Sequence, residues 1–192
     1  MQPTSHFLWL ALRPMLLDDL FDELGEYIRV HQLENTIELQ SRDSLHITLY
    51  YLGSIVSESE QSTCLELLGS WKIARKRNIH LRWCQYFYRG DLPYILHIEP
   101  DNIEYFVHKN KQASEKLHRD DVVENQFPFA PHITIIRILD VERFALHAEA
   151  VENMIQSHIE WMWDDPIQDG FAFYSVDSRV HPELQERLDL SK

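Results

Sequence analysis

A short motif that occurs twice constrains most strongly how this chain of 192 residues can fold. The first copy lies in residues 45–53, LHITLYYLG, and the second lies in residues 131–137, PHITIIR. Both contain His-Ile-Thr followed by an apolar residue, once at His46 and once at His132. Because both copies are short runs of β-branched and apolar residues, each predicts a β-strand.

Each predicted strand carries one imidazole and one hydroxyl on the same face. Side chains two positions apart share a face of a strand, which pairs His46 with Thr48 and His132 with Thr134. Two such strands facing each other across a groove would line it with two imidazoles and two hydroxyls. Proton transfer around a phosphate needs one base and one acid near neutral pH, and hydroxyls can donate to phosphate oxygens. One copy alone carries little weight among 11 histidines, whereas a matched pair is much less expected by chance.

The rest of the chain predicts interspersed helices and strands, and therefore an α+β fold. Apolar residues at helical spacing predict helices near residues 14–28, 58–71, 102–119 and 141–158. Apolar and β-branched runs predict strands at residues 7–12, 36–39, 45–52, 79–88, 94–98 and 171–176. Residues 181–190 are expected to form a tail or a short helix. Three further histidines fit neither motif and are expected to be structural or exposed: His97, His108 and His118.

Three stretches carry a resemblance to a known family. They are residues 7–14 (FLWLALRP), residues 43–53 with the first motif, and residues 127–137 with the second. The last stretch includes a proline before the histidine and an arginine five residues after it. On these stretches the sequence resembles the 2H phosphoesterase superfamily, in particular the RNA 2′,3′-cyclic phosphodiesterases, also called 2′-5′ RNA ligases. Between about residues 71 and 120 the match rests on the order of elements alone.

The resemblance implies a two-lobed α+β fold built from a pseudo-twofold duplicated unit. Each lobe would be an antiparallel sheet backed by helices, and the two motifs would line a central cleft. We therefore expect residues 1–192 to form a single bilobal domain, with the first motif at residues 45–53 and the second at residues 131–137.

The resemblance also implies an activity, the metal-independent hydrolysis of 2′,3′-cyclic phosphates to 2′-phosphomonoesters. The substrates would be RNA ends or small cyclic nucleotides, and 2′-5′ RNA ligation would be the reverse reaction. One imidazole would deprotonate water for in-line attack, while the other would protonate the departing 3′ oxygen. The related enzymes imply His46 as the acid and His132 as the base, with the roles exchanged in the ligating direction. No cofactor and no metal are expected.

Three side chains are implied to hold the phosphate. Thr48 and Thr134 would contact its oxygens, and Arg137 would add charge-assisted hydrogen bonds. Arg137 lies five residues after His132, so a regular strand would point it away from the face of that histidine. It reaches the phosphate only if the strand ends, twists or bulges near Ile136.

Two tyrosines in the first motif are candidates to stack on a nucleobase. Tyr51 lies five residues after His46, where the resemblance implies an aromatic ring against the base, although a core position fits it equally well. Tyr50 shares the face of His46 by strict alternation and is the rival candidate. The family often has a basic residue at the position of Tyr50, so this tyrosine departs from the pattern.

Other functions stay open on the sequence. The resemblance also fits a phosphodiesterase for another bond, such as 2′-5′ linked oligoadenylate, or a non-catalytic protein that binds RNA ends. A metal hydrolase with histidine ligands is disfavoured, because His-x-Thr lacks the paired His or carboxylate spacing of metal sites.

The net charge of −13 argues against an extended nucleic-acid surface. Either the groove is locally basic or the substrate is short, and we favour the second explanation. The only dense basic cluster, in residues 72–77, is more typical of a solvated helix end.

No run approaches 18 apolar residues, no signal peptide is evident, and Cys64 and Cys84 lack redox or metal spacing. We expect a cytoplasmic monomer that does not bind membranes.

Overall fold

The computed structural model describes residues 4–12, 17–53, 56–71, 80–117, 128–159, 167–177 and 186–188. For residues 4–5, 167–177 and 186–188 it describes the backbone alone. The basic cluster of residues 72–77 and His118 lie outside the described residues.

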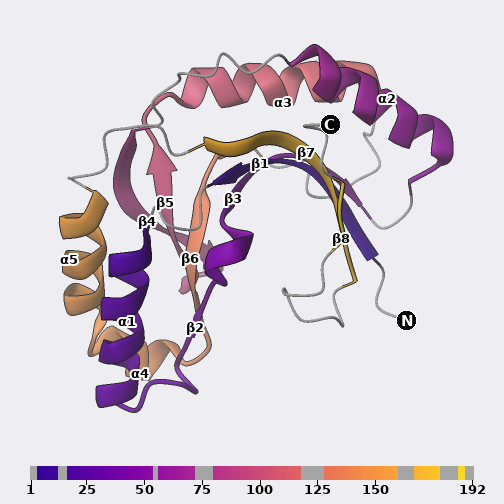
Figure 1. Cartoon of the computed structure of the whole chain (residues 1–192). Coiled ribbons are helices and arrows are strands. Elements are labelled where there is room, and N and C mark those ends of the chain that lie inside the picture. The colour runs from indigo at the N-terminus through magenta and orange to yellow at the C-terminus, as the bar shows by residue number, and fades with distance from the viewer. Residues whose placement is uncertain are drawn as a thin grey trace.

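Two four-stranded antiparallel sheets form the framework of the described chain (Figure 1). The first sheet has the order β3 (His46–Gly53), β1 (Thr4–Leu12), β7 (Ile167–Asp177) and β8 (Glu186–Leu188). The second has the order β2 (Ile37–Leu39), β6 (Ile133–Ile138), β5 (Leu92–Pro100) and β4 (Leu81–Arg89). The predicted α+β class is therefore confirmed, and the two motif strands lie in different sheets.

The α-helices of the described residues cover these sheets in two groups. Their bounds are α1 (Asp18–Val30), α2 (Glu58–Ser70), α3 (Ile103–Leu117), α4 (Val141–Ala145) and α5 (Ala148–Ile159). Helices α2 and α3 pack on each other and against the first sheet, through β7 and β3. Helices α1, α4 and α5 pack against the second sheet, through β2, β5 and β4.

The sequence accounts for where these helices bury surface and where they begin. Helix α1 places Leu20, Phe21, Leu24 and Ile28 on one buried face, at the spacing of an amphipathic helix. Helix α2 begins after Ser57, whose hydroxyl accepts a hydrogen bond from the backbone N–H of Glu60 while the Glu60 carboxylate accepts one from the backbone N–H of Ser57.

The two sheets repeat one arrangement. Each motif strand pairs with the strand that precedes a helix, β3 with β1 and β6 with β5, and that strand pairs in turn with β7 or β4. Helix α1, which follows β1, covers the second sheet, whereas α3, which follows β5, covers the first. Each sheet is therefore covered by a helix that follows a strand of the other sheet.

Strand β1 has two buried faces that belong to different clusters. Leu8, Leu10 and Leu12 belong to the main hydrophobic core, whereas Trp9 and Ala11 form a separate cluster with Phe7 on the opposite face. In the pairing with β3, Trp9 lies beside Thr48 and Ala11 lies beside His46, so this second cluster shares its face with the motif side chains.

A β-bulge interrupts each motif strand at the third residue after the histidine. In the first sheet Thr48 pairs with Trp9 and Tyr50 pairs with Leu8, which leaves Leu49 as an extra residue. An extra residue shifts the alternation of side chains by one position. Tyr50 is therefore turned into the core, with 2% of its surface exposed, and Tyr51 returns to the face of Thr48.

The second motif strand has the same bulge. Thr134 pairs with His97 and Ile136 pairs with Leu96, so Ile135 is the extra residue. Ile136 is fully buried and Arg137 is exposed, which places Arg137 on the face of Thr134. The condition under which Arg137 could reach a phosphate, a bulge near Ile136, is thus met.

A hydrogen bond from a neighbouring element holds each bulge. The side-chain amide of Asn110, on α3, donates to the carbonyl of Leu49 at 2.7 Å. The backbone N–H of Gln40 donates to the carbonyl of Ile135 at 2.9 Å. Since a buried carbonyl without a partner is costly, these two donors favour the bulged form of each strand.

Two expectations from the sequence need correction. The segment at residues 186–188 is a strand, not a tail or a helix, because it pairs with the outer edge of β7. The single helix expected over residues 141–158 is broken at Leu146 and His147 into α4 and α5.

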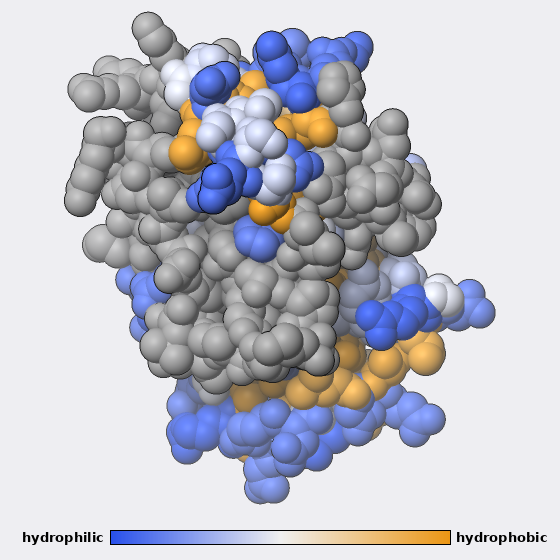
Figure 2. All heavy atoms as spheres, turned by 90° about the vertical axis from the view of Figure 1, so that its right-hand side faces the viewer, coloured by the Kyte–Doolittle hydropathy of each residue, from blue (hydrophilic) through white to orange (hydrophobic). Residues whose placement is uncertain are grey.

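None of the described helices is long and apolar enough to cross a bilayer. Figure 2 shows hydrophilic side chains at the upper and lower ends of one face of the molecule.

The hydrogen bond to the first bulge gives a prediction about stability. Asn110→Ala should lower the free energy of unfolding by about 1–3 kcal/mol, because the Leu49 carbonyl then lacks its donor in a partly buried site. Denaturant unfolding of the wild type and the variant measures this. Lys111→Ala, an exposed position on the same helix, is the control and should cost less than about 0.5 kcal/mol. Equal costs for the two variants would contradict the role of Asn110.

Candidate active site

The two motif histidines are held in the same way. Nδ1 of His46 donates to the carbonyl of Ser44 at 2.6 Å, and Nδ1 of His132 donates to the carbonyl of Ala130 at 2.8 Å. A carbonyl oxygen can only accept, so Nδ1 carries the proton in both neutral rings. The lone pair of each ring is therefore on Nε2, the atom that can take up or release a proton.

Aromatic side chains of β1 enclose His46. The Phe7 ring is stacked on the imidazole with the centroids 5.5 Å apart, and the centroid of the Trp9 ring lies 4.8 Å from that of the imidazole. This burial is the main reason why the pKa of His46 falls from 6.5 to about 4. The hydrogen bond to the Ser44 carbonyl opposes the fall, whereas the charges of His132 and Arg137 add to it.

The charge of the second motif thus acts on the histidine of the first. His132 and Arg137 lie on β6 or directly before it, and both disfavour the imidazolium form of His46. Electrostatic coupling of this kind requires that the three side chains be near one another. These three side chains, although far apart in the sequence, therefore lie close enough for their charges to interact.

His132 has surroundings that differ from those of His46. The Phe87 ring meets it edge to face with the centroids 4.6 Å apart, and the His97 ring lies 5.2 Å away. Burial lowers the pKa of His132, while its hydrogen bond to the Ala130 carbonyl acts in the opposite direction. Both motif imidazoles are therefore predominantly neutral at pH 7 in the unliganded protein.

His97 is a third imidazole beneath this part of the site. It is 1% exposed, stacks on Phe87 with a centroid distance of 4.0 Å, and pairs with Thr134 in the sheet. Burial first, and the charge of His132 second, lower its pKa to about 3. Of the histidines expected to be structural or exposed, His97 is buried and His108 is exposed. The contact of His97 with His132 has no signal in the sequence, because it depends on the pairing of β5 with β6.

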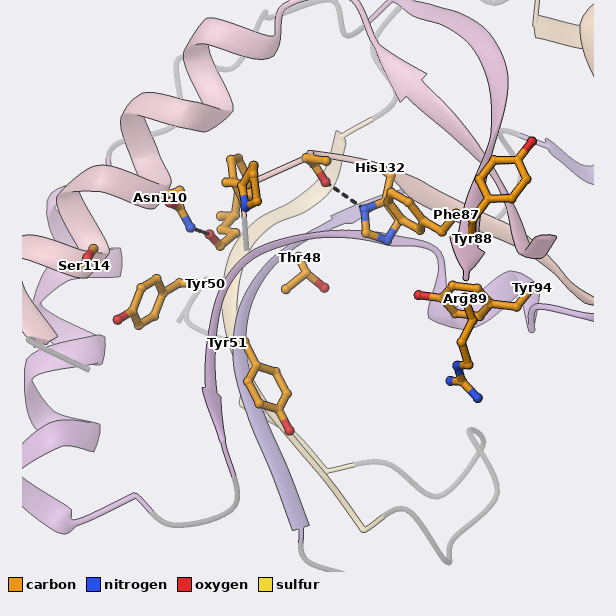
Figure 3. A pocket seen from close by; sticks show the side chains of 14 residues that line it. Thr48, Tyr50, Tyr51, Phe87, Tyr88, Arg89, Tyr94, Asn110, Ser114 and His132 are labelled. Carbon is orange, nitrogen blue, oxygen red and sulfur yellow. Dashed lines mark hydrogen bonds between the residues drawn. The ribbon is translucent and has the colours of Figure 1, made fainter. Parts of the chain in front are cut away.

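A pocket of about 690 Å³ joins residues from both motifs. Thr48, Tyr50 and Tyr51 from β3 and His132 from the second motif line it (Figure 3). Figure 3 shows Tyr51 on the same side of β3 as Thr48, whereas Tyr50 points toward α3. Of the two candidate aromatic residues, Tyr51 therefore faces the space beside the motif side chains.

Three predicted site residues, His46, Thr134 and Arg137, are not among those that line this pocket. His46 and Thr134 are half-buried, and Arg137 is exposed, with its Nε 4.0 Å from a carboxylate oxygen of Glu38. At that distance and exposure the contact with Glu38 is weak and leaves the guanidinium able to bind an anion.

Sequence reasoning missed one wall of the pocket. Phe87, Tyr88 and Arg89 at the end of β4 and Tyr94 on β5 line it, together with Phe129. The aromatic residues of β4 predicted a strand, but their position in the pocket depends on the pairing of β5 with β6.

In the part of the chain that the structure describes, no group of three or more His, Cys, Asp or Glu side chains is placed to hold a metal ion.

No family model and no curated protein matches this sequence. Solved structures match it over nearly its whole length. TT0787 of Thermus thermophilus is 18% identical, with a TM-score of 0.60 over 96% of this chain and 93% of that one. LigT of E. coli in complex with 3′-AMP is 16% identical, with a TM-score of 0.56 over 97% and 94%. Usb1 of Kluyveromyces marxianus is 12% identical, with a TM-score of 0.54 over 91% and 94%.

This chain therefore has the fold of these structures, and a further structure with the same fold, 16% identical with a TM-score of 0.55 over 96% of this chain and 94% of that one, is a phosphoesterase. The resemblance drawn from the two motifs is confirmed at the level of the fold.

The lowered pKa of His46 makes stability depend on pH. The unfolded chain takes up this proton near pH 6.5 and the folded chain only near pH 4, so the unfolded state binds more protons between these values. Stability should be full above about pH 6.5 and fall as the pH drops toward 4, by up to about 3 kcal/mol from this residue.

Denaturant unfolding at pH 7 and pH 5 measures the effect. His46→Asn keeps a donor for the Ser44 carbonyl but cannot titrate, so its stability should fall less between the two pH values than that of the wild type. A variant as sensitive to pH as the wild type would show that His46 is not desolvated.

Proposed function

We propose that this protein is a metal-independent phosphodiesterase that hydrolyses 2′,3′-cyclic phosphate ends of RNA or small nucleotides to 2′-phosphomonoesters. The observation that carries the proposal is the matched pair of imidazoles, each bound through Nδ1 to a backbone carbonyl and each on a strand with the same bulge. Structures with the same fold support it, since LigT was solved with 3′-AMP, with ATP and with phosphate.

In this mechanism Nε2 of His132 removes a proton from water, which attacks phosphorus in line with the 3′ oxygen. Protonated His46 donates to that oxygen as it leaves, so the ring P–O bond breaks and a 2′-phosphomonoester remains. A bound phosphate carries negative charge and favours the imidazolium form, which opposes the effect of burial on His46. Substrate binding thus raises the pKa of His46 and favours the protonated acid that the reaction needs.

The phosphate is held by neutral and charged donors. The hydroxyls of Thr48 and Thr134 donate to its oxygens, and Arg137 neutralises the charge that develops in the transition state. Tyr51 stacks on the nucleobase of the terminal nucleotide, on the same side of β3 as Thr48. The reverse reaction, 2′-5′ ligation, would use the same residues with acid and base exchanged.

We further propose a single bilobal domain that acts as a cytoplasmic monomer. The two cysteines are unpaired thiols, Cys64 buried and Cys84 half-buried, which agrees with a reducing compartment.

The histidines give the direct test of the proposal. His46→Ala and His132→Ala should each lower turnover of a 2′,3′-cyclic mononucleotide by about 10²–10⁴-fold, because each removes one half of the proton transfer. The double variant should lose little more than either single variant, since neither half works alone. His108→Ala, an exposed histidine of α3, is the matched control and should keep wild-type turnover.

Melting temperatures of the same proteins separate catalysis from folding. Variants that fold as the wild type does but still open the cyclic phosphate at the wild-type rate would refute the proposal.

Assays of 2′-5′ linked adenylate, with and without a chelator, distinguish the other functions. Cleavage of that substrate alone would identify an oligoadenylate-type phosphodiesterase, and binding without turnover an RNA-end-binding protein. Turnover lost on chelation and restored by zinc or manganese would identify a metal hydrolase.

A further inference from the structure

His97 is a buried imidazole that the proposed mechanism does not use. It is 1% exposed, and neither of its ring nitrogens has a hydrogen-bond partner among the described residues. A buried polar side chain without a hydrogen bond costs free energy, and native proteins rarely keep one. His97 lies directly beside His132, with the ring centroids 5.2 Å apart, so its effect on that residue is the first to consider.

The other half of the molecule has a different ring at the same position. Trp9 on β1 and His97 on β5 each pair with the threonine of the neighbouring motif strand, so the two residues occupy equivalent places in the two sheets. The sequence around them is also similar, LWL in residues 8–10 and LHI in residues 96–98. An indole therefore fits this place in one half, and an imidazole takes it in the other.

The two rings have equivalent contacts with the motif histidines. The Trp9 ring lies 4.8 Å from the His46 ring between centroids, close to the 5.2 Å between His97 and His132. The two motif histidines thus differ in the chemistry of one buried neighbour. An indole has an N–H donor but no lone pair to offer, whereas a neutral imidazole has both a donor and an acceptor.

Phe87 packs against both imidazoles of the second half. Its ring stacks on His97 with the centroids 4.0 Å apart and meets His132 edge to face at 4.6 Å, and Figure 3 shows Phe87 next to His132. These contacts need only an aromatic ring at position 97. Packing therefore does not account for the two buried nitrogens of His97.

Glu99 supplies a negative charge next to His97. One carboxylate oxygen of Glu99 lies 3.5 Å from Nε2 of His97, which is longer than a good hydrogen bond but close enough to favour a proton on that nitrogen. The lone pair of neutral His97 is then on Nδ1. Burial, and second the charge of His132, lower the pKa of His97 to about 3, so His97 stays neutral while His132 titrates.

A neutral imidazole in this tautomer favours a positive charge on its neighbour. Burial disfavours the imidazolium form of His132. A ring with a lone pair beside it, and a carboxylate beyond that ring, offset part of this cost, which an apolar ring could not do. His97 and Glu99 therefore make His132 a stronger base than burial alone would allow.

We infer that His97 is a positioning residue that makes the second motif the basic half of the site. Together with Glu99, its neutral ring favours the imidazolium that His132 becomes when it removes a proton from water. This inference rests on the proposed function for the assignment of His132 as the base.

The pKa of His132, measured by NMR titration of its imidazole, tests the inference without turnover. His97→Phe keeps a ring that stacks on Phe87 but removes both nitrogens, so it should lower the pKa of His132 by about 0.5–1 unit. Glu99→Gln removes the carboxylate charge and should also lower it. In kcat/KM for a 2′,3′-cyclic mononucleotide, one limb of the pH profile should move to lower pH with each variant.

Two further variants separate the polarity of His97 from its packing. His97→Gln keeps an N–H for Glu99 and an uncharged acceptor, so the pKa of His132 should stay nearer to the wild-type value than in His97→Phe. Trp9→Phe exchanges one aromatic ring for another at the equivalent place beside His46, and should leave the pKa of His132 unchanged. Arg137 keeps its charge throughout the titration, and the pKa of His46 in each variant is the internal reference.

A His97→Phe variant that melts like the wild type and has an unchanged pKa of His132 overturns the inference, because His97 would then only pack. If that variant does not fold, Glu99→Gln at a partly exposed position decides in the same way. Failure of the proposed function is a different result, in which the wild type does not open cyclic phosphates although the pKa of His132 still depends on His97.

Discussion

One extra residue in each motif strand decides which side chains meet the groove. Without the bulges at Leu49 and Ile135, strict alternation would turn Tyr51 and Arg137 away from the faces of Thr48 and Thr134. Both bulges are held from outside their own strand, one by a side chain of α3 and the other by the backbone that continues β2. The site thus depends on packing between elements, not on the motif strands alone.

Desolvation sets the protonation state of this site. Burial lowers the pKa of His46 and of His132, so the unliganded groove has two neutral imidazoles, and exposed Arg137 adds a positive charge beside them. An anionic substrate brings the charge that makes one imidazolium favourable. In a chain of net charge −13, such local control replaces long-range attraction for a polyanion.

The sequence predicted the individual helices and strands better than the contacts between them. The paired His-x-Thr motifs identified both motif strands, and apolar spacing identified α1, α2 and α3, because these signals are local. Whether Tyr50 or Tyr51 faces the groove was undecidable, since it depends on a bulge that the Asn110 hydrogen bond stabilises from another element. The wall of Tyr88, Arg89 and Tyr94 was missed for a similar reason, as only the pairing of β5 with β6 brings it to the second motif.

The pH dependence of catalysis tests most directly whether His46 and His132 act as an acid and a base on one phosphate. We expect bell-shaped profiles, with kcat/KM centred on the acid side of pH 6.5, because both pKa values are lowered in the free protein. The kcat profile should lie at higher pH, since bound phosphate favours the imidazolium. His46→Ala and His132→Ala should each lose one limb, opposite limbs in the two variants. A bell with both limbs in either variant would contradict the account.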